Sequence, residues 1–275
     1  IRMLKLCRQN GIFVGWNFMC RFPGEKDEWY GDMAGLLPLL HHLQPAPRMV
    51  KLRFDRFSQY FNQQQRFGLH LEPYPQFVQT YRFSESTADG LSYFFKDKSQ
   101  RELDDNPFLS ALLTGDGFSA CNKALSRWNE AYDQDEPPVL EKRTRGGQRW
   151  IRDTRSCRVT EYHDLQDLEW DLLKALDEGL SAKELTRWAE KRSLSRDNLQ
   201  YSLDSLEERK LVLHLDGIWL SLVFLRPTPA KPHTRDYPGG IFTRTDSAFP
   251  WWEDEQREVR RLREQNRPEA MPESF

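Results

Sequence analysis

The chain has 275 residues, of which 38% are hydrophobic and 30% are charged, a composition typical of a chain that buries a core. Its 42 acidic and 40 basic side chains leave a formal net charge of -2. No global field would therefore draw the whole molecule to nucleic acid or to an anionic membrane. No stretch of sequence approaches the roughly 18 consecutive apolar residues of a membrane span.

The N-terminus shows neither a signal peptide nor a transit peptide. The chain starts with Ile1 and continues in a helical pattern to Gln9, so we expect an excerpt whose first partner is the missing N-terminal part of the same protein. The cysteines at 7, 20, 121 and 157 lie far apart. That spacing is typical of a reducing cytoplasm and not of a disulfide scaffold.

The first 60 residues alternate between helical and strand patterns. A helix is expected over 1–9, a strand over 12–20, a helix over 28–43 and a strand over 49–57. This order is typical of βαβ units, in which helices cover a parallel sheet. An α+β domain with antiparallel strands is the alternative that the pattern leaves open.

Residues 58–98 are rich in loop signals, and one or two helices are expected over 106–132. Two short strands, about 139–145 and 148–154, flank Gly146-Gly147, a dipeptide typical of a tight hairpin.

The clearest fold signal lies between residues 165 and 225, where leucines three and four residues apart predict a helix. Ser181 and Glu184 form a capping box for a second helix, and Ser195 can cap a third. Asp216-Gly217 then joins two short strands. Three helices followed by a β-hairpin indicate a winged-helix arrangement. A Pro-rich tail with a charged helix at about 251–265 is expected to follow.

One candidate site is the segment GWNFMCRFPGE, residues 15–25, where a buried strand enters a Pro-Gly turn. Glycine lets backbone groups approach a ligand closely, and ligands bind at the carboxyl ends of parallel strands. Glu25 could equally be a simple helix-start residue, which the helix dipole favours.

A second candidate is the segment LRFDRFSQYF, residues 52–61. Strand alternation places Arg53 and Asp55 on one face, with Phe54 on the other. Because both faces of a parallel sheet are covered, we expect both charges to point into a barrel interior near the strand's carboxyl end. An Arg–Asp pair that merely holds a loop is the alternative.

These two segments, together with LLPLLHHLQP at 36–45, resemble the family known as RiPP maturation radical SAM protein 1, a group of radical S-adenosylmethionine (SAM) enzymes. The hairpin ending in IRDTR at 151–155 is similar as well, so the resemblance covers about residues 1–225. It implies an α/β fold, with the closing strands of a partial TIM-type radical SAM barrel followed by a winged-helix-like α+β domain.

The resemblance also implies a function. Such enzymes modify, and in some relatives C-methylate, a ribosomally synthesised precursor peptide during bacteriocin or other natural-product maturation. A [4Fe-4S] cluster reduces SAM to a 5′-deoxyadenosyl radical, and a cobalamin domain can supply a methyl group. The CxxxCxxC cluster motif is absent from this chain, so we expect it upstream of Ile1 and expect the excerpt alone to be inactive.

The site residues implied by the resemblance fall into two groups. The first group is expected to bind SAM or the residues that hold it, and consists of Asn17, Glu25 and Arg53. The second is expected to bind substrate or to shape the end of the strand, and consists of Asp55, Arg56 and Ser58. No metal ligand is expected in this chain. The family usually has glycine before Phe-Pro-Gly-Glu, whereas this chain has Arg21, a cation that either crowds SAM or reaches its carboxylate.

Four parts are predicted along the chain. They are the C-terminal part of the barrel over 1–98, a helical connector over 99–137, the hairpin with the winged-helix-like domain over 138–225, and the tail over 226–275.

Two charged stretches bear on the choice of partner. The expected third helix, Ser195–Lys210, carries three basic and four acidic side chains, so we expect docking to a protein or peptide, not to nucleic acid. A purely structural cap on the barrel is the alternative. The basic stretch Lys142–Arg158 could grip an acidic leader peptide, or it could be neutralised by the acidic stretch Glu161–Glu178. Two rival functions stay open: a non-catalytic winged-helix regulator or docking module on an α/β sensor domain, and a cobalamin-type radical enzyme acting on small molecules.

Overall fold

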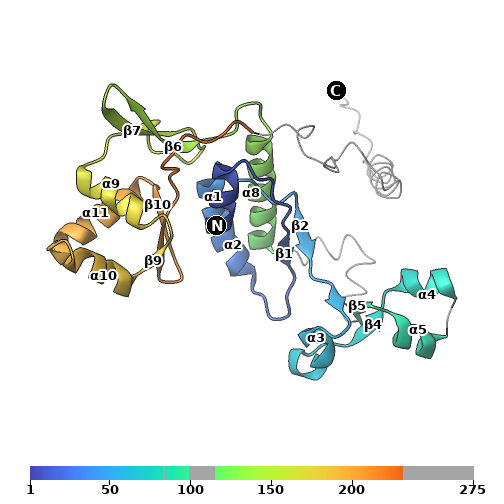
Figure 1. The fold of residues 1–275 in the computed structure, drawn as a ribbon. Coiled ribbons are helices and arrows are strands. Elements are labelled where there is room, and N and C mark those ends of the chain that lie inside the picture. The colour runs from blue at the N-terminus through green and yellow to red at the C-terminus, as the bar shows by residue number, and fades with distance from the viewer. Residues whose placement is uncertain (83, 99–114, 232–275) are drawn as a thin grey trace, which may run out of the picture. The chain divides into compact units, whose positions relative to one another are not determined.

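The computed structural model describes residues 1–82, 84–98 and 115–231. All described residues except Lys231 belong to one compact unit, Ile1–Ala230. The tail helix expected at about 251–265 lies outside the described residues, as does the part of the expected connector before Gly115. The described elements form a mixed α/β structure with small separate sheets (Figure 1). None of the described helices is long and apolar enough to cross a membrane.

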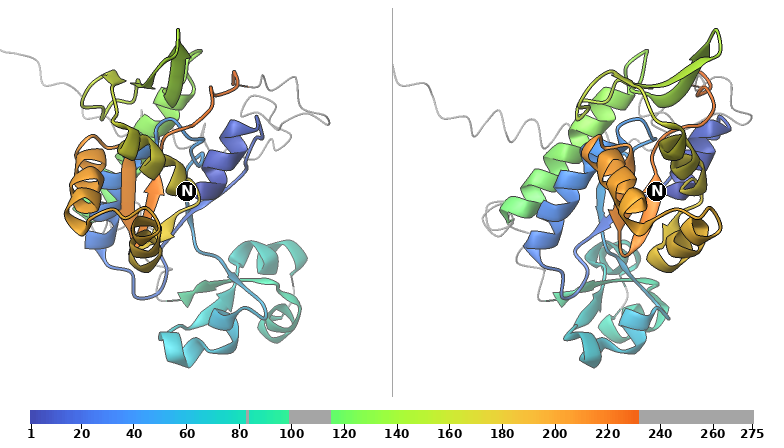
Figure 2. Two further views of the ribbon diagram at one scale, coloured as in Figure 1. Left: turned by 60° about the vertical axis from the view of Figure 1, so that its left-hand side comes forward. Right: turned by 90° about the vertical axis from the view of Figure 1, so that its left-hand side faces the viewer.

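The N-terminal part is built around two parallel strands, as the alternating pattern predicts. Strand β1 (Phe18–Cys20) pairs in parallel with β2 (Met49–Lys51). Helices α1 (Arg2–Gln9) and α2 (Asp27–Leu36) come from the same stretch of chain, and α8 (Asp116–Tyr132) lies beside α2 (Figures 1 and 2). Their buried apolar side chains belong to the main hydrophobic core.

The strand expected over 12–20 is much shorter in the structure, and Gln44 supplies the reason. Its side-chain amide donates to the Val14 carbonyl at 2.7 Å, and its Oε1 accepts from the Val14 N–H at 3.0 Å. These two bonds satisfy backbone groups that a neighbouring strand would otherwise pair. Residues 12–17 therefore run as an irregular segment held by a side chain.

The helix expected over 28–43 ends early. Regular α-helix stops at Leu36, and the chain tightens into the 3₁₀ turn η1 (Leu37–Leu40). Pro38 lies inside that turn and has no N–H to continue the α-helical ladder.

The strand expected over 49–57 divides into two. After β2 the chain enters a separate antiparallel sheet with the order β3-β5-β4, formed by β3 (Phe54–Asp55), β5 (Phe94–Asp97) and β4 (Leu71–Pro73). This sheet has its own small core of Phe54, Leu69 and Phe95. The prediction of one parallel strand is wrong for residues 54–55, and the described strands do not close a barrel.

Four short helices accompany this second sheet. They are α3 (Gln59–Asn62), η2 (Gln64–Phe67), α4 (Pro75–Tyr81) and α5 (Glu85–Leu91).

The predicted hairpin at Gly146-Gly147 is confirmed. Strands β6 (Leu140–Arg145) and β7 (Gln148–Asp153) pair antiparallel. Both glycines have positive φ, at 58° and 83°, which suits a tight hairpin turn. Strand β8 (Tyr162–His163) adds to β7.

The three helices predicted between 165 and 210 are confirmed as α9 (Asp167–Ala175), α10 (Ala182–Glu190) and α11 (Arg196–Glu208). The capping box at Ser181 and Glu184 and the Ser195 cap are both present. Strands β10 (Val212–Leu215) and β11 (Ile218–Ser221) form the predicted hairpin. A two-residue strand that no sequence signal marks, β9 (Leu180–Ser181), completes a sheet ordered β10-β11-β9.

Candidate functional site

The two parallel strands end side by side at one edge. The Leu52 N–H donates to the Cys20 carbonyl at 2.8 Å, the last backbone bond before the strands diverge. The chain after β1 then forms a turn in which the Glu25 N–H donates to the Phe22 carbonyl at 3.1 Å, with Gly24 at a φ of +82°. The expected strand-to-turn feature is therefore present at the carboxyl edge of a parallel pair.

Glu25 is held in this turn by a buried tyrosine. The Tyr30 hydroxyl donates to the Glu25 carboxylate, and its oxygen accepts from the Arg21 N–H at 2.9 Å. Burial raises the pKa of Tyr30, and the hydrogen bond to Glu25 raises it further. The phenol thus stays a donor across the physiological pH range and fixes the position of the Glu25 carboxylate.

Asn17, the other candidate of this segment, is an exposed residue just before β1.

Arg21 adopts the left-handed conformation, with a φ of +65°. Glycine takes that conformation without steric cost, whereas a residue with a Cβ does not. The guanidinium lies over the Phe118 ring of α8, with 4.4 Å between Cζ and the ring centroid. The Arg21 side chain therefore packs against α8, although the radical SAM family that this segment resembles usually has glycine at this position.

Arg53 and Asp55 do share a face, but not in a barrel interior. Arg53 Nε donates to Asp55 Oδ1 at 2.9 Å, and the two side chains are 51% and 38% exposed. The Arg53 guanidinium also lies over the Phe94 ring at 3.8 Å. Their strand pairs antiparallel with β5. The expectation of an interior pair on a parallel strand is therefore wrong, because the chain has left the first sheet before Phe54.

Arg56 and Ser58 have partners within the protein. Arg56 donates from Nε to the Ser92 carbonyl at 2.6 Å and from a terminal nitrogen to the Asp89 carbonyl. These are carbonyls at the C-terminal end of α5, where a cation is favoured. The Ser58 hydroxyl accepts from the Phe61 N–H at 3.2 Å and caps α3. Arg56 thus holds α5, and Ser58 holds α3, beside the second sheet.

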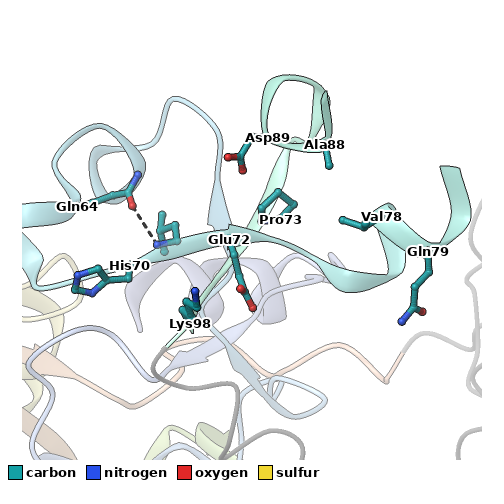
Figure 3. A pocket seen from close by; sticks show the side chains of 10 residues that line it. Gln64, His70, Glu72, Pro73, Val78, Gln79, Ala88, Asp89 and Lys98 are labelled. Atoms are coloured by element: carbon teal, nitrogen blue, oxygen red, sulfur yellow. Dashed lines mark hydrogen bonds between the residues drawn. The ribbon is translucent and has the colours of Figure 1, made fainter. Parts of the chain in front are cut away.

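The second sheet carries a half-open pocket of about 630 Å³ (Figure 3). Strand β4 and helices α4 and α5 contribute most of its wall, and Gln64, His70 and Lys98 complete it. Its charged groups are Glu72, Asp89 and Lys98. The sequence indicated only a loop-rich stretch here, because the wall combines residues from segments that have no motif in common.

The cysteines of this chain do not fit an iron–sulfur cluster. Cys7 lies in α1, Cys20 ends β1, Cys121 lies in α8 and Cys157 follows β7, and all four are free. Within the described ranges no three His, Cys, Asp or Glu side chains form a group that could hold a metal ion. A radical SAM cluster needs three thiolates at one site, and these four thiols do not provide them.

A buried ion pair that sequence reasoning missed lies just after β7. The guanidinium of Arg155 donates to both carboxylate oxygens of Asp153, at 2.9 and 2.7 Å, and both side chains are fully buried. It also donates to the Leu39 carbonyl at 2.8 Å and the Lys210 carbonyl at 2.7 Å. One side chain thus ties η1, β7 and the end of α11 together. The IRDTR motif contains both residues, but its spacing does not reveal their partners.

Three buried histidines lie near this pair. Burial lowers the pKa of His41, His42 and His163. The nearby Arg155 charge adds to the effect in each, and at His163 the Asp153 carboxylate opposes it. His42 is the most strongly affected and donates from Nε2 to the Leu222 carbonyl at 2.9 Å. The folded protein therefore keeps all three imidazoles neutral at pH 7.

These histidines predict a loss of stability on acidification. An unfolded histidine titrates near pH 6.5. Below that pH the unfolded state therefore binds more protons than the folded state, in which the histidines stay neutral. Stability should be complete above that pH and should fall as pH drops below it, by at most about 1.4 kcal/mol per pH unit for a histidine that stays neutral in the folded state, and most for His42. Urea unfolding between pH 7.5 and 5 measures the slope. Replacing His42 by Gln should reduce it, and a flat profile would contradict the assignment.

The basic stretch around the hairpin is largely neutralised inside the chain. Arg149 pairs with Asp167 and Arg152 with Glu161, the latter at 3.3 Å, while Arg143 pairs with Glu141. The alternative in which the acidic stretch Glu161–Glu178 neutralises the basic one is therefore confirmed for Arg149 and Arg152, whereas Arg143 pairs with a residue of its own strand.

Searches against protein-family models, curated proteins and solved structures found no match for this chain.

Proposed function

We propose that this chain is the C-terminal part of a cytoplasmic radical SAM maturase that modifies, in one version by C-methylation, a ribosomally synthesised precursor peptide. The supporting observation is the strand-to-turn segment 15–25 at the carboxyl edge of a parallel pair, where Tyr30 fixes the Glu25 carboxylate. Ligands in α/β folds bind at such edges. The three-helix and hairpin segment after residue 165 is proposed to be the winged-helix-like domain, and the parallel pair to belong to a partial TIM-type barrel.

In this proposal the preceding part of the protein holds the [4Fe-4S] cluster and any cobalamin. SAM, when bound and reduced there, supplies the 5′-deoxyadenosyl radical. Asn17, Glu25 and Arg53 remain the candidates for holding SAM, with Asp55 a candidate substrate contact. Arg56 and Ser58 act by positioning α5 and α3.

Helix α1 buries charged side chains and exposes apolar ones, and this unusual pattern supports the proposal that a partner covers its outer face. Lys5 is 2% exposed and donates to Asp177 at 2.6 Å and to the Ser221 carbonyl at 2.7 Å, and Arg8 is buried as well. Met3 and Leu6 face outward instead, at 61% and 41% exposure. An exposed apolar stripe of this kind is typical of an interface, and the proposal assigns it to the preceding part of the same protein.

The test uses the full-length protein, prepared anaerobically and incubated with SAM and a reductant. Formation of 5′-deoxyadenosine, followed by mass spectrometry, is the expected result, and its absence from a preparation that holds an iron–sulfur cluster would contradict the proposal. In the same protein, Asp55→Asn should lower peptide modification while changing stability by no more than about 1 kcal/mol, because the ion pair is exposed. Unchanged modification would remove Asp55 from the site.

A non-catalytic docking or regulatory module is the second candidate. The order α9-β9-α10-α11-β10-β11 with a three-stranded antiparallel sheet favours it. The exposed carboxylates of α11, at Asp197, Asp204, Glu207 and Glu208, argue for a protein or peptide partner over duplex DNA. A full-length protein that lacks a CxxxCxxC segment would favour this candidate.

A further inference from the structure

The pocket beside β4 has the size and composition of a ligand site. Its volume of about 630 Å³ lies within the range of about 300–1,000 Å³ that is typical of such sites. Leu71, Pro73, Val78 and Ala88 provide apolar wall, and Gln64 and Gln79 provide amides. It is neither a purely apolar slot nor a purely charged one.

The outer edge of β4 is closed to a further strand. The neighbouring residues His70 and Tyr74 use their backbone groups toward β5, since the His70 carbonyl accepts from Lys98 at 2.7 Å and the Tyr74 N–H donates to Phe94 at 3.3 Å. On the other edge, the Leu71 N–H already donates to Gln64 Oε1 at 3.1 Å, and Pro73 has no N–H. Residues 71 and 73 thus offer no N–H to a further strand, so only part of a strand's hydrogen bonds could form on this edge. We therefore expect a ligand to be recognised mainly through its side chains.

The charges favour a cation over an anion. Figure 3 shows Asp89 extending from α5 on one side of the β4 ribbon, and Glu72 and Lys98 on the other. Two carboxylates and one ammonium group line the pocket, so a phosphate or carboxylate ligand would meet net repulsion. Arg56 holds the end of α5 through the Asp89 and Ser92 carbonyls, which positions the helix that carries Asp89.

We propose that this pocket binds a segment of the precursor peptide through a Lys or Arg side chain that pairs with the Asp89 carboxylate. The choice of a peptide rests on the proposed function. The amides of the wall suit peptide groups, and the apolar residues suit the methylene stem of a long basic side chain. Asp89 is then the residue that determines specificity.

The experiment measures peptide binding to the full-length protein by fluorescence anisotropy. The probes are two fluorescein-labelled nonapeptides that differ only in a central Lys or its neutral isostere norleucine. We expect the Lys peptide to bind at least tenfold more tightly. Asp89→Asn should abolish that difference, whereas Asp135→Asn, at an exposed carboxylate that follows α8, should preserve it. If Asp89→Asn alters folding, Gln79→Arg provides a second test, because an added cation should weaken the Lys peptide selectively.

Equal affinity for the two peptides, or an unchanged preference in Asp89→Asn, would overturn the inference. Spermidine that competes at the same concentration as the Lys peptide would also overturn it, because the pocket would then be a small-amine site. Binding requires neither SAM nor a cluster, so this result is independent of 5′-deoxyadenosine formation. Failure of one proposal is thereby distinguishable from failure of the other.

Discussion

Replacing Arg155 by alanine is expected to destabilise the protein by about 3–5 kcal/mol, which is a large part of the roughly 5–15 kcal/mol that holds a typical domain together. The substitution leaves the Asp153 carboxylate buried without its cation and removes the donors to the Leu39 and Lys210 carbonyls. Three segments would lose their common attachment at once. Urea unfolding at pH 7.5 measures the loss.

The matched control is Arg152→Ala, three residues earlier in β7. Its ion pair with Glu161 is 3.3 Å long, and both side chains are more than a third exposed, so the expected change is within about 1 kcal/mol. Arg155→Lys should recover only part of the stability, because an ammonium group cannot form the two-pronged contact with the carboxylate. Equal, small effects of Arg155→Ala and Arg152→Ala would show that the buried pair does not tie the segments together.

Replacing Trp128 by alanine should cost about 3–5 kcal/mol, the range for removing a buried aromatic side chain. Trp128 is fully buried in α8 and packs against the Trp16 ring at 6.0 Å. Its indole N–H also donates to the Leu43 carbonyl at 2.8 Å. The substitution therefore leaves both a cavity and an unpaired carbonyl between α8 and the segment after η1. Thermal and urea unfolding should both record it.

Two further variants separate these contributions. Trp128→Phe keeps most of the ring volume and removes the donor, so it should cost clearly less than Trp128→Ala. Trp29→Ala serves as the control for losing a tryptophan, because Trp29 is 50% exposed on α2 and its loss should matter little. If Trp29→Ala destabilised the protein as much as Trp128→Ala, the core assigned to α8 would be wrong.

The candidate site could be predicted only where neighbours in sequence decide the geometry. The strand-to-turn segment ending at Glu25 could be predicted because a Pro-Gly pair forces a turn locally. The contact between Glu25 and Tyr30 could not, since it depends on how α2 follows the turn. Arg53 and Asp55 were placed correctly on a common face by period-two alternation, but alternation carries no information about which sheet the strand joins.

The sequence by itself determined the elements whose signals are local. The hairpin at Gly146-Gly147, the helices capped at Ser181 and Ser195, and the turn at Asp216-Gly217 all depend on contacts within a few residues. Only the tertiary structure decided that Gln44 replaces a strand beside Val14 and that Arg155 joins segments more than 50 residues away. Those bonds form between backbone and side-chain groups that are distant in sequence, so no spacing of residue types records them.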